Sequence, residues 1–159
     1  MMMAQDRSME QQAAEELAFL LQYLELTNEM NRYLTLYRLL SGDVLDGMRV
    51  SKELRRICQS KGISFLPERM QMLSGYGDYT YMRRKWKKEL RRQKKLSDNT
   101  KRTAYSQMEK EKSIKNDDFP EWKSIVQRIS NFGTPLWNCL CRGELFVGDW
   151  MPELERFLD

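Results

Sequence analysis

Residues 15–40, EELAFLLQYLELTNEMNRYLTLYRLL, decide how this chain folds. Large apolar side chains recur here at alternating spacings of four and three residues, at Phe19, Tyr23, Leu26, Met30, Tyr33, Tyr37 and Leu40. This is the period of an amphipathic α-helix, so it predicts one long helix that ends at Gly42. A second apolar strip lies at the start of this helix, at Leu17, Leu20, Leu21 and Leu24. That end must be covered by the rest of the chain or by a partner.

Helical signals recur along the rest of the sequence. A helix over 48–61 is expected from the shared face of Val50, Leu54 and Ile57, and one over 79–96 from Tyr79, Met82, Trp86 and Leu90. Pro120 starts a further helix that Gly133 ends, Pro135 starts a short helix through Leu140, and Pro152 opens a last turn. Because no long run alternates with period two, the fold class is all-α.

The predicted fold is a small helical bundle with a long N-terminal helix, a basic helix in mid-chain and an aromatic-rich C-terminal segment. We divide it into a flexible tail (1–14), a helical core (15–96) that includes the basic helix 79–96, a polar linker or weak helix (97–118) and a C-terminal helical segment (119–159). The last segment carries Trp137, Phe146, Trp150 and Phe157. These aromatic residues either close the core or form a docking surface for a protein partner.

Charge is distributed unevenly along the 159 residues. The chain has 27 Lys and Arg against 23 Asp and Glu, a net charge of +4. Residues 83–102 alone hold eleven Lys and Arg against Glu89 and Asp98. An asymmetry of this kind indicates a local anionic partner and not a uniformly basic protein.

The basic run over 83–95 is the most informative motif. Its cationic members are Arg83, Arg84, Lys85, Lys87, Lys88, Arg91, Arg92, Lys94 and Lys95. Like charges at i,i+4 repel on a helix, so a neutralising anion would stabilise it. Three interpretations stay open: a solvated helix face, a nuclear localisation signal for an importin-type acidic groove, and a contact surface for RNA or DNA. Trp86 inside the run either stacks on a base or belongs to the core.

A second motif lies in the N-terminal helix. Leu17, Leu20, Leu24 and Leu26 have the spacing of a leucine-rich nuclear export signal. Such a segment places large apolar side chains in a hydrophobic groove of its receptor, while flanking acids such as Glu25 stay in solvent. The same spacing also fits an ordinary core helix.

Residues for catalysis or metal binding are scarce. The sequence has no histidine, which removes the commonest general base and a common metal ligand. Cys58, Cys139 and Cys141 provide three thiols, one fewer than the four ligands of a structural zinc site. We therefore expect no enzyme activity, no metal and no cofactor. Without an apolar run of about 20 residues, we also expect no membrane span.

The chain is short and helical, with the leucines of Leu17–Leu26 near its start and a basic helix around Trp86. In these features it resembles small viral nuclear export proteins, such as those of influenza-like viruses, and arginine-rich viral RNA-export factors. The sequence predicts a non-enzymatic regulatory or adaptor protein that shuttles between nucleus and cytoplasm. Its partners would be nuclear transport receptors and RNA or an acidic protein surface. The alternative is a homo-oligomeric structural or interaction protein that assembles through a coiled coil of residues 19–40.

Overall fold

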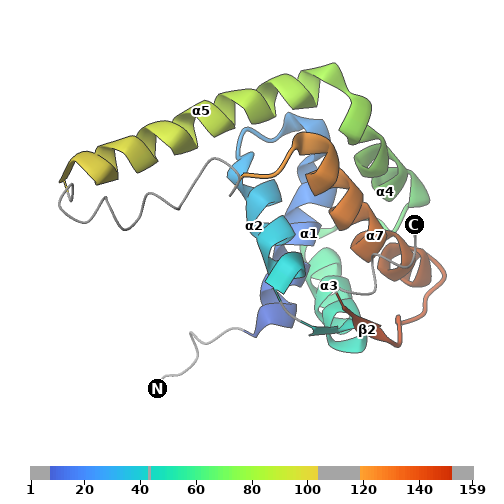
Figure 1. Cartoon of the computed structure of the whole chain (residues 1–159). Coiled ribbons are helices and arrows are strands. Elements are labelled where there is room, and N and C mark those ends of the chain that lie inside the picture. The colour runs from blue at the N-terminus through green and yellow to red at the C-terminus, as the bar shows by residue number, and fades with distance from the viewer. Residues whose placement is uncertain (1–7, 43, 104–118, 152–159) are drawn as a thin grey trace.

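The computed structural model describes residues 8–42, 44–103 and 119–151. Its elements are α1 (Met9–Tyr23), the 3-10 turn η2 (Leu24–Leu26), α2 (Asn31–Gly42), β1 (Leu45–Asp46), α3 (Gly47–Lys61), α4 (Pro67–Ser74), the 3-10 turn η3 (Gly75–Asp78), α5 (Thr80–Thr103), α7 (Trp122–Cys141) and β2 (Asp149–Trp150). Within the described part, the only strands are β1 and β2, which pair antiparallel. The predicted all-α class is confirmed as a small helical bundle (Figure 1).

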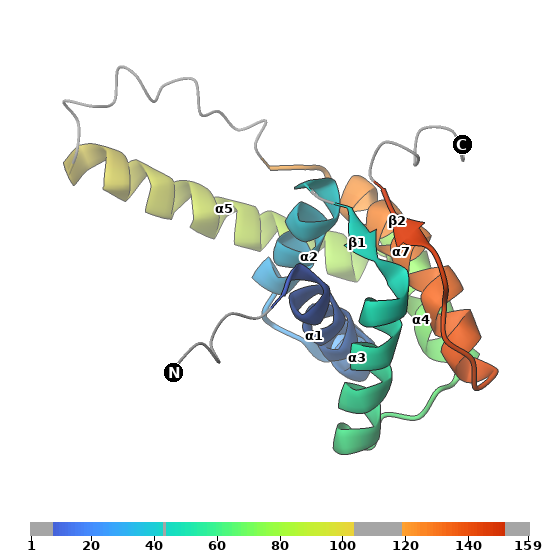
Figure 2. The same cartoon turned by 90° about the horizontal axis from the view of Figure 1, so that it is seen from below.

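Helix α1 packs against α2, α3 and α4 along one face (Figure 2). The Ser8 hydroxyl caps its start by accepting a hydrogen bond from the Gln11 N–H at 3.1 Å. Residues 9–14, expected in a flexible tail, are instead the first six residues of α1. The buried side chains of α1 are Ala13, Ala14, Leu17, Ala18, Leu20 and Leu21. Each fully buried leucine contributes roughly 1.5–3 kcal/mol.

The expectation of one uninterrupted helix over 15–40 is corrected to two helices joined by a turn. Leu24 has a φ of 53°, outside the helical region, and ends α1 while its N–H still bonds the Leu20 carbonyl. A non-glycine residue in such a conformation costs about 1–3 kcal/mol. The Thr27 hydroxyl accepts the Glu29 N–H at 3.0 Å and shapes the following turn. The turn folds α2 back on α1, so burial of both helices outweighs the local strain.

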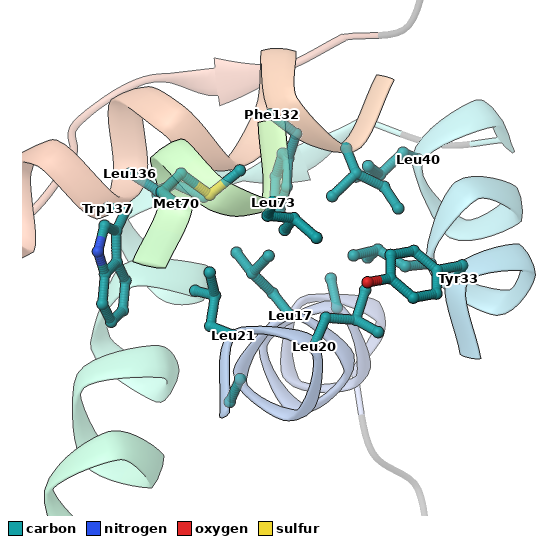
Figure 3. Packing of buried hydrophobic residues seen from close by; sticks show 14 of the residues in the cluster. Leu17, Leu20, Leu21, Tyr33, Leu40, Met70, Leu73, Phe132, Leu136 and Trp137 are labelled. Atoms are coloured by element: carbon teal, nitrogen blue, oxygen red, sulfur yellow. The ribbon is translucent and has the colours of Figure 1, made fainter. Parts of the chain in front are cut away.

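This turn divides the apolar seam expected for a coiled coil of residues 19–40. Tyr23 and Leu26 are exposed at the turn, whereas the seam residues of α2 face inward against α1 and α7. The buried seam residues are Tyr33 and Leu40 on α2 and Met30 directly before it. Figure 3 shows Tyr33 and Leu40 of α2 across from the leucines of α1. The described residues therefore present no continuous apolar seam to a second copy.

Helix α7 is continuous across the predicted break at Gly133, which is a second correction. Gly133 faces Met70 of α4, and a Cβ there would lie 3.1 Å from the Met70 Cε. The glycine thus serves close packing of two helices and does not end α7. Pro135 inside the helix has no N–H to donate, so one hydrogen bond of this turn is missing. Burial of the apolar face of α7 compensates for this loss.

The C-terminal aromatic residues close the core. Trp150 on β2 donates its indole N–H to the Leu40 carbonyl at 2.8 Å, and its ring meets Phe132 edge-on at 5.5 Å. Trp137 is fully buried and donates to the Leu66 carbonyl at 2.7 Å. Core closure is thereby confirmed for these two tryptophans. Phe157 and the turn expected after Pro152 lie outside the described residues.

Gly47 provides a test of the contact between α3 and the β2 end of the chain. Its N–H donates to the Gly148 carbonyl at 2.7 Å, and an added Cβ would lie 2.2 Å from that same oxygen. We expect Gly47→Ala to lower the free energy of unfolding by about 1–3 kcal/mol, since the backbone must move apart. Gly75→Ala is the matched control because nothing lies within 4 Å of its Cβ position. Urea titration measures both, and equal midpoints would contradict the contact.

Candidate nucleic-acid interface

Helix α5 is held to the bundle along one face of its first half. Met82 and Trp86 are buried, Leu90 is partly buried, and Trp86 donates its indole N–H to the Pro120 carbonyl at 3.2 Å. Trp86 is therefore a core residue. With 24 residues, α5 is about 36 Å long. Its second half extends beyond α2, away from the other helices (Figures 1 and 2).

Lys85, one of the predicted binding residues, is engaged within the chain. Its ammonium donates to the backbone carbonyls of Glu25 at 2.8 Å and of Thr27 at 2.7 Å. It also lies 4.7 Å from the centre of the Tyr81 ring. Lys85 thus fastens α5 to the turn between α1 and α2.

Glu25 and Tyr76 reinforce this attachment, and sequence reasoning missed both roles. The Tyr76 hydroxyl donates to the Glu25 carboxylate at 2.7 Å. This hydrogen bond is the main cause that lowers the pKa of Glu25, with the backbone and Lys85 adding to it. Burial first, and then the same carboxylate, raise the pKa of Tyr76. No sequence signal pairs residues 51 positions apart.

Arg83 and Arg92 are also engaged within the chain. Arg83 donates to the Gly77 carbonyl at 3.3 Å and lies 4.0 Å from Asp78. Arg92 pairs with Glu89 at 2.7 Å, on the side of α5 that faces the bundle. Burial raises the pKa of Glu89, but hydrogen bonds from Arg92 and Gln93 outweigh it, so this pKa is lowered. Both arginine side chains stay about half exposed, but each already has a carboxylate partner within the chain.

The other predicted cations form one coherent surface, which we call the cationic face. Its members are Arg84, Lys87, Lys88, Arg91, Lys94 and Lys95, all exposed and without an ion-pair partner among the described residues. At 3.6 residues per turn they fall within about 120° of the helix circumference. This arc lies opposite Met82 and Trp86, which face the bundle. Over 83–96 the one carboxylate, Glu89, lies on the inward side.

An open groove lies beside the cationic face, between α5 and the start of α7. Its volume is about 380 Å³. The lining residues are Arg83, Trp86, Lys87, Leu90, Glu121, Trp122 and Lys123. The α7 half of this groove was not singled out as a site by sequence reasoning, because α5 and α7 are separated by many residues in the chain.

The predicted export leucines do not form one exposed strip. Leu17 and Leu20 are fully buried in the core shown in Figure 3, Leu24 is partly buried, and Leu26 is 75% exposed. A receptor groove for all four side chains would need α1 to leave the bundle. The core-helix interpretation therefore describes Leu17 and Leu20 in the folded chain.

The described part of the molecule offers few groups for metal binding or thiol chemistry. It contains no group of three or more His, Cys, Asp or Glu side chains that could hold a metal ion. Cys58 is buried, which raises the pKa of its thiol to about 11 and disfavours the reactive thiolate. Among the described helices, none has both the length and the apolar character needed to cross a membrane.

A comparison with known proteins finds no matching family model, no similar curated protein and no similar solved structure. The geometry and charge of α5 and of the groove beside it are therefore the features that indicate a function.

Lys85→Ala tests the attachment of α5. Two carbonyls lose their charged donor, so we expect the free energy of unfolding to fall by about 1.5–3 kcal/mol. Lys88→Ala removes the same charge from the cationic face and should leave stability unchanged. Chemical denaturation of both variants measures the difference. A Lys85→Ala variant as stable as Lys88→Ala would contradict the structural role of this lysine.

Proposed function

We propose that this chain is a non-enzymatic adaptor that binds RNA through the cationic face of α5. One observation carries the proposal: six exposed Lys and Arg side chains share one side of a helix that extends beyond its own bundle. Carboxylates of the chain neutralise Arg83 and Arg92, but they leave these six without partners in the described part. A phosphate backbone supplies closely spaced anions that suit such a surface.

The physical gain comes from two sources. Phosphate contacts release counterions from the nucleic acid, and they remove the repulsion between cations at i,i+4 along α5. Six contacts to a single strand predict that the logarithm of the affinity falls with the logarithm of salt with a slope of about −4. Because the cationic face lies opposite the buried side of α5, a strand reaches it without a change of fold.

Traffic between nucleus and cytoplasm is part of the same proposal. The cationic face is also the surface that an acidic groove of a nuclear import receptor would contact. Export through the leucines costs free energy of folding, because Leu17 and Leu20 would have to leave the core. We therefore propose entry through folded α5, and export only through chains in which α1 has opened.

Binding is tested with a single-stranded RNA labelled for fluorescence anisotropy. We expect the double variant Lys88→Ala/Lys95→Ala to weaken binding. The slope of the logarithm of the affinity against the logarithm of salt should become shallower by about 1.4, because two phosphate contacts are lost. The control Lys52→Ala/Lys61→Ala removes two exposed lysines of α3, on another part of the surface. It should bind as the unaltered chain does. Equal losses in both variants, or no salt-dependent binding, would contradict the assignment.

Export is tested by imaging a tagged full-length chain with and without an exportin inhibitor. Leu26→Ala is the informative substitution because this side chain is 75% exposed, so its loss leaves the core intact. We expect nuclear accumulation with the inhibitor and the same accumulation with Leu26→Ala. If neither changes the distribution, the export hypothesis for this segment is contradicted.

A further inference from the structure

The groove between α5 and α7 has an apolar floor and a polar rim. Trp86, Leu90 and Trp122 contribute the apolar side chains, and the two indole rings lie 6.2 Å apart. Both indole N–H groups already donate to carbonyls, Trp86 to Pro120 and Trp122 to Tyr76. The tryptophans are 2% and 3% exposed, so they offer a ligand a small apolar surface without a free donor of their own. At about 380 Å³ the groove is in the size range of small-molecule sites.

The rim connects this groove to the cationic face. Lys87 belongs to both, since it lines the groove and lies within the exposed arc of α5. Lys123 reaches the rim from α7, and its ammonium lies 3.5 Å from the exposed Asp78. Arg83 shares that carboxylate at 4.0 Å. An anionic ligand would compete with the solvated Asp78 carboxylate for these two cations, and the Glu121 carboxylate also lines the groove.

We propose that this groove takes one unpaired base of the single-stranded RNA that the cationic face binds. The inference rests on the proposed RNA-binding function and adds a substrate class to it. The base lies against Leu90 and the small exposed part of the two tryptophans, and the flanking phosphates contact Lys87 and the cations that follow it on α5. An apolar floor beside a rim of three cations and one carboxylate matches the apolar base and charged backbone of one nucleotide.

The geometry of the groove favours a single strand over a duplex. A base in a duplex is stacked and paired, so it reaches such a groove only after it has been unstacked. A single strand presents its bases without that cost. Positions four apart on α5, such as Lys87 and Arg91, are separated by about 6 Å along the axis. An extended strand that follows the helix would therefore meet successive cations with successive phosphates.

The test compares three probes on the full chain at one salt concentration: a single-stranded RNA, the same strand with every base removed, and the corresponding duplex. The phosphates and sugars of the first two are the same. We expect the strand with bases to bind at least tenfold more tightly than the abasic strand and the duplex. Equal affinities for all three would overturn the groove inference and leave the phosphate-binding proposal standing.

Leu90→Ala removes part of the groove floor. It should reduce binding of the strand with bases several-fold while leaving the abasic affinity unchanged. Leu96→Ala is the matched control, an exposed leucine of the same helix outside the groove. An equal effect of the two substitutions would overturn the inference.

A second measurement needs no variant. Cytidine monophosphate should quench the tryptophan emission of the unaltered chain, because Trp86 and Trp122 line the groove, whereas ribose 5-phosphate should not. Quenching by both or by neither overturns the inference. If the chain binds polyglutamate and no RNA, the partner is an acidic protein, and both the proposed function and the groove inference fail.

Discussion

The burial of the leucine and alanine face of α1 is the constraint on which the rest of this structure depends. Covering this face demands several helices: α2, α3 and α4 pack against it, and the Leu17 side chain lies against Gly133 of α7. That demand explains why the chain tolerates the unfavourable conformation of Leu24, because only a sharp turn lets α2 return along α1. It also explains why Gly133 lies in mid-helix, where it lets α7 approach Met70 of α4.

Helix α5 packs against the bundle on one side only, and its two sides have different roles. One side holds the helix to the bundle through Met82, Trp86 and the Lys85 ammonium, while Glu89 draws Arg92 toward the inward side. The other side is left entirely cationic over 83–96. A density of like charge that would destabilise an isolated helix is sustained here by tertiary contacts on the opposite face.

The candidate site was predictable in part. Placing residues 83–96 on a helical wheel separates the cationic face from the apolar stripe without any structure, since both follow the same period of 3.6. The same wheel puts Arg83, Lys85 and Arg92 at the borders of the stripe, where long side chains bend toward the core. Their partners were not predictable, because Lys85 bonds carbonyls 58 and 60 positions away. The α7 half of the groove depends on packing in the same way.

The sequence by itself determined the helical class, the positions of most helices and the concentration of charge in α5, because period, capping and charge are properties of neighbouring residues. Only the tertiary structure decided where the 15–40 stretch bends, which leucines of the export-like motif are buried, and that Gly133 and Pro135 stay within one helix. In each of these cases, the local conformational preference of the sequence competes with the burial of side chains against distant segments. Here burial is worth more, so the local signals for a continuous helix and for a helix stop were overridden.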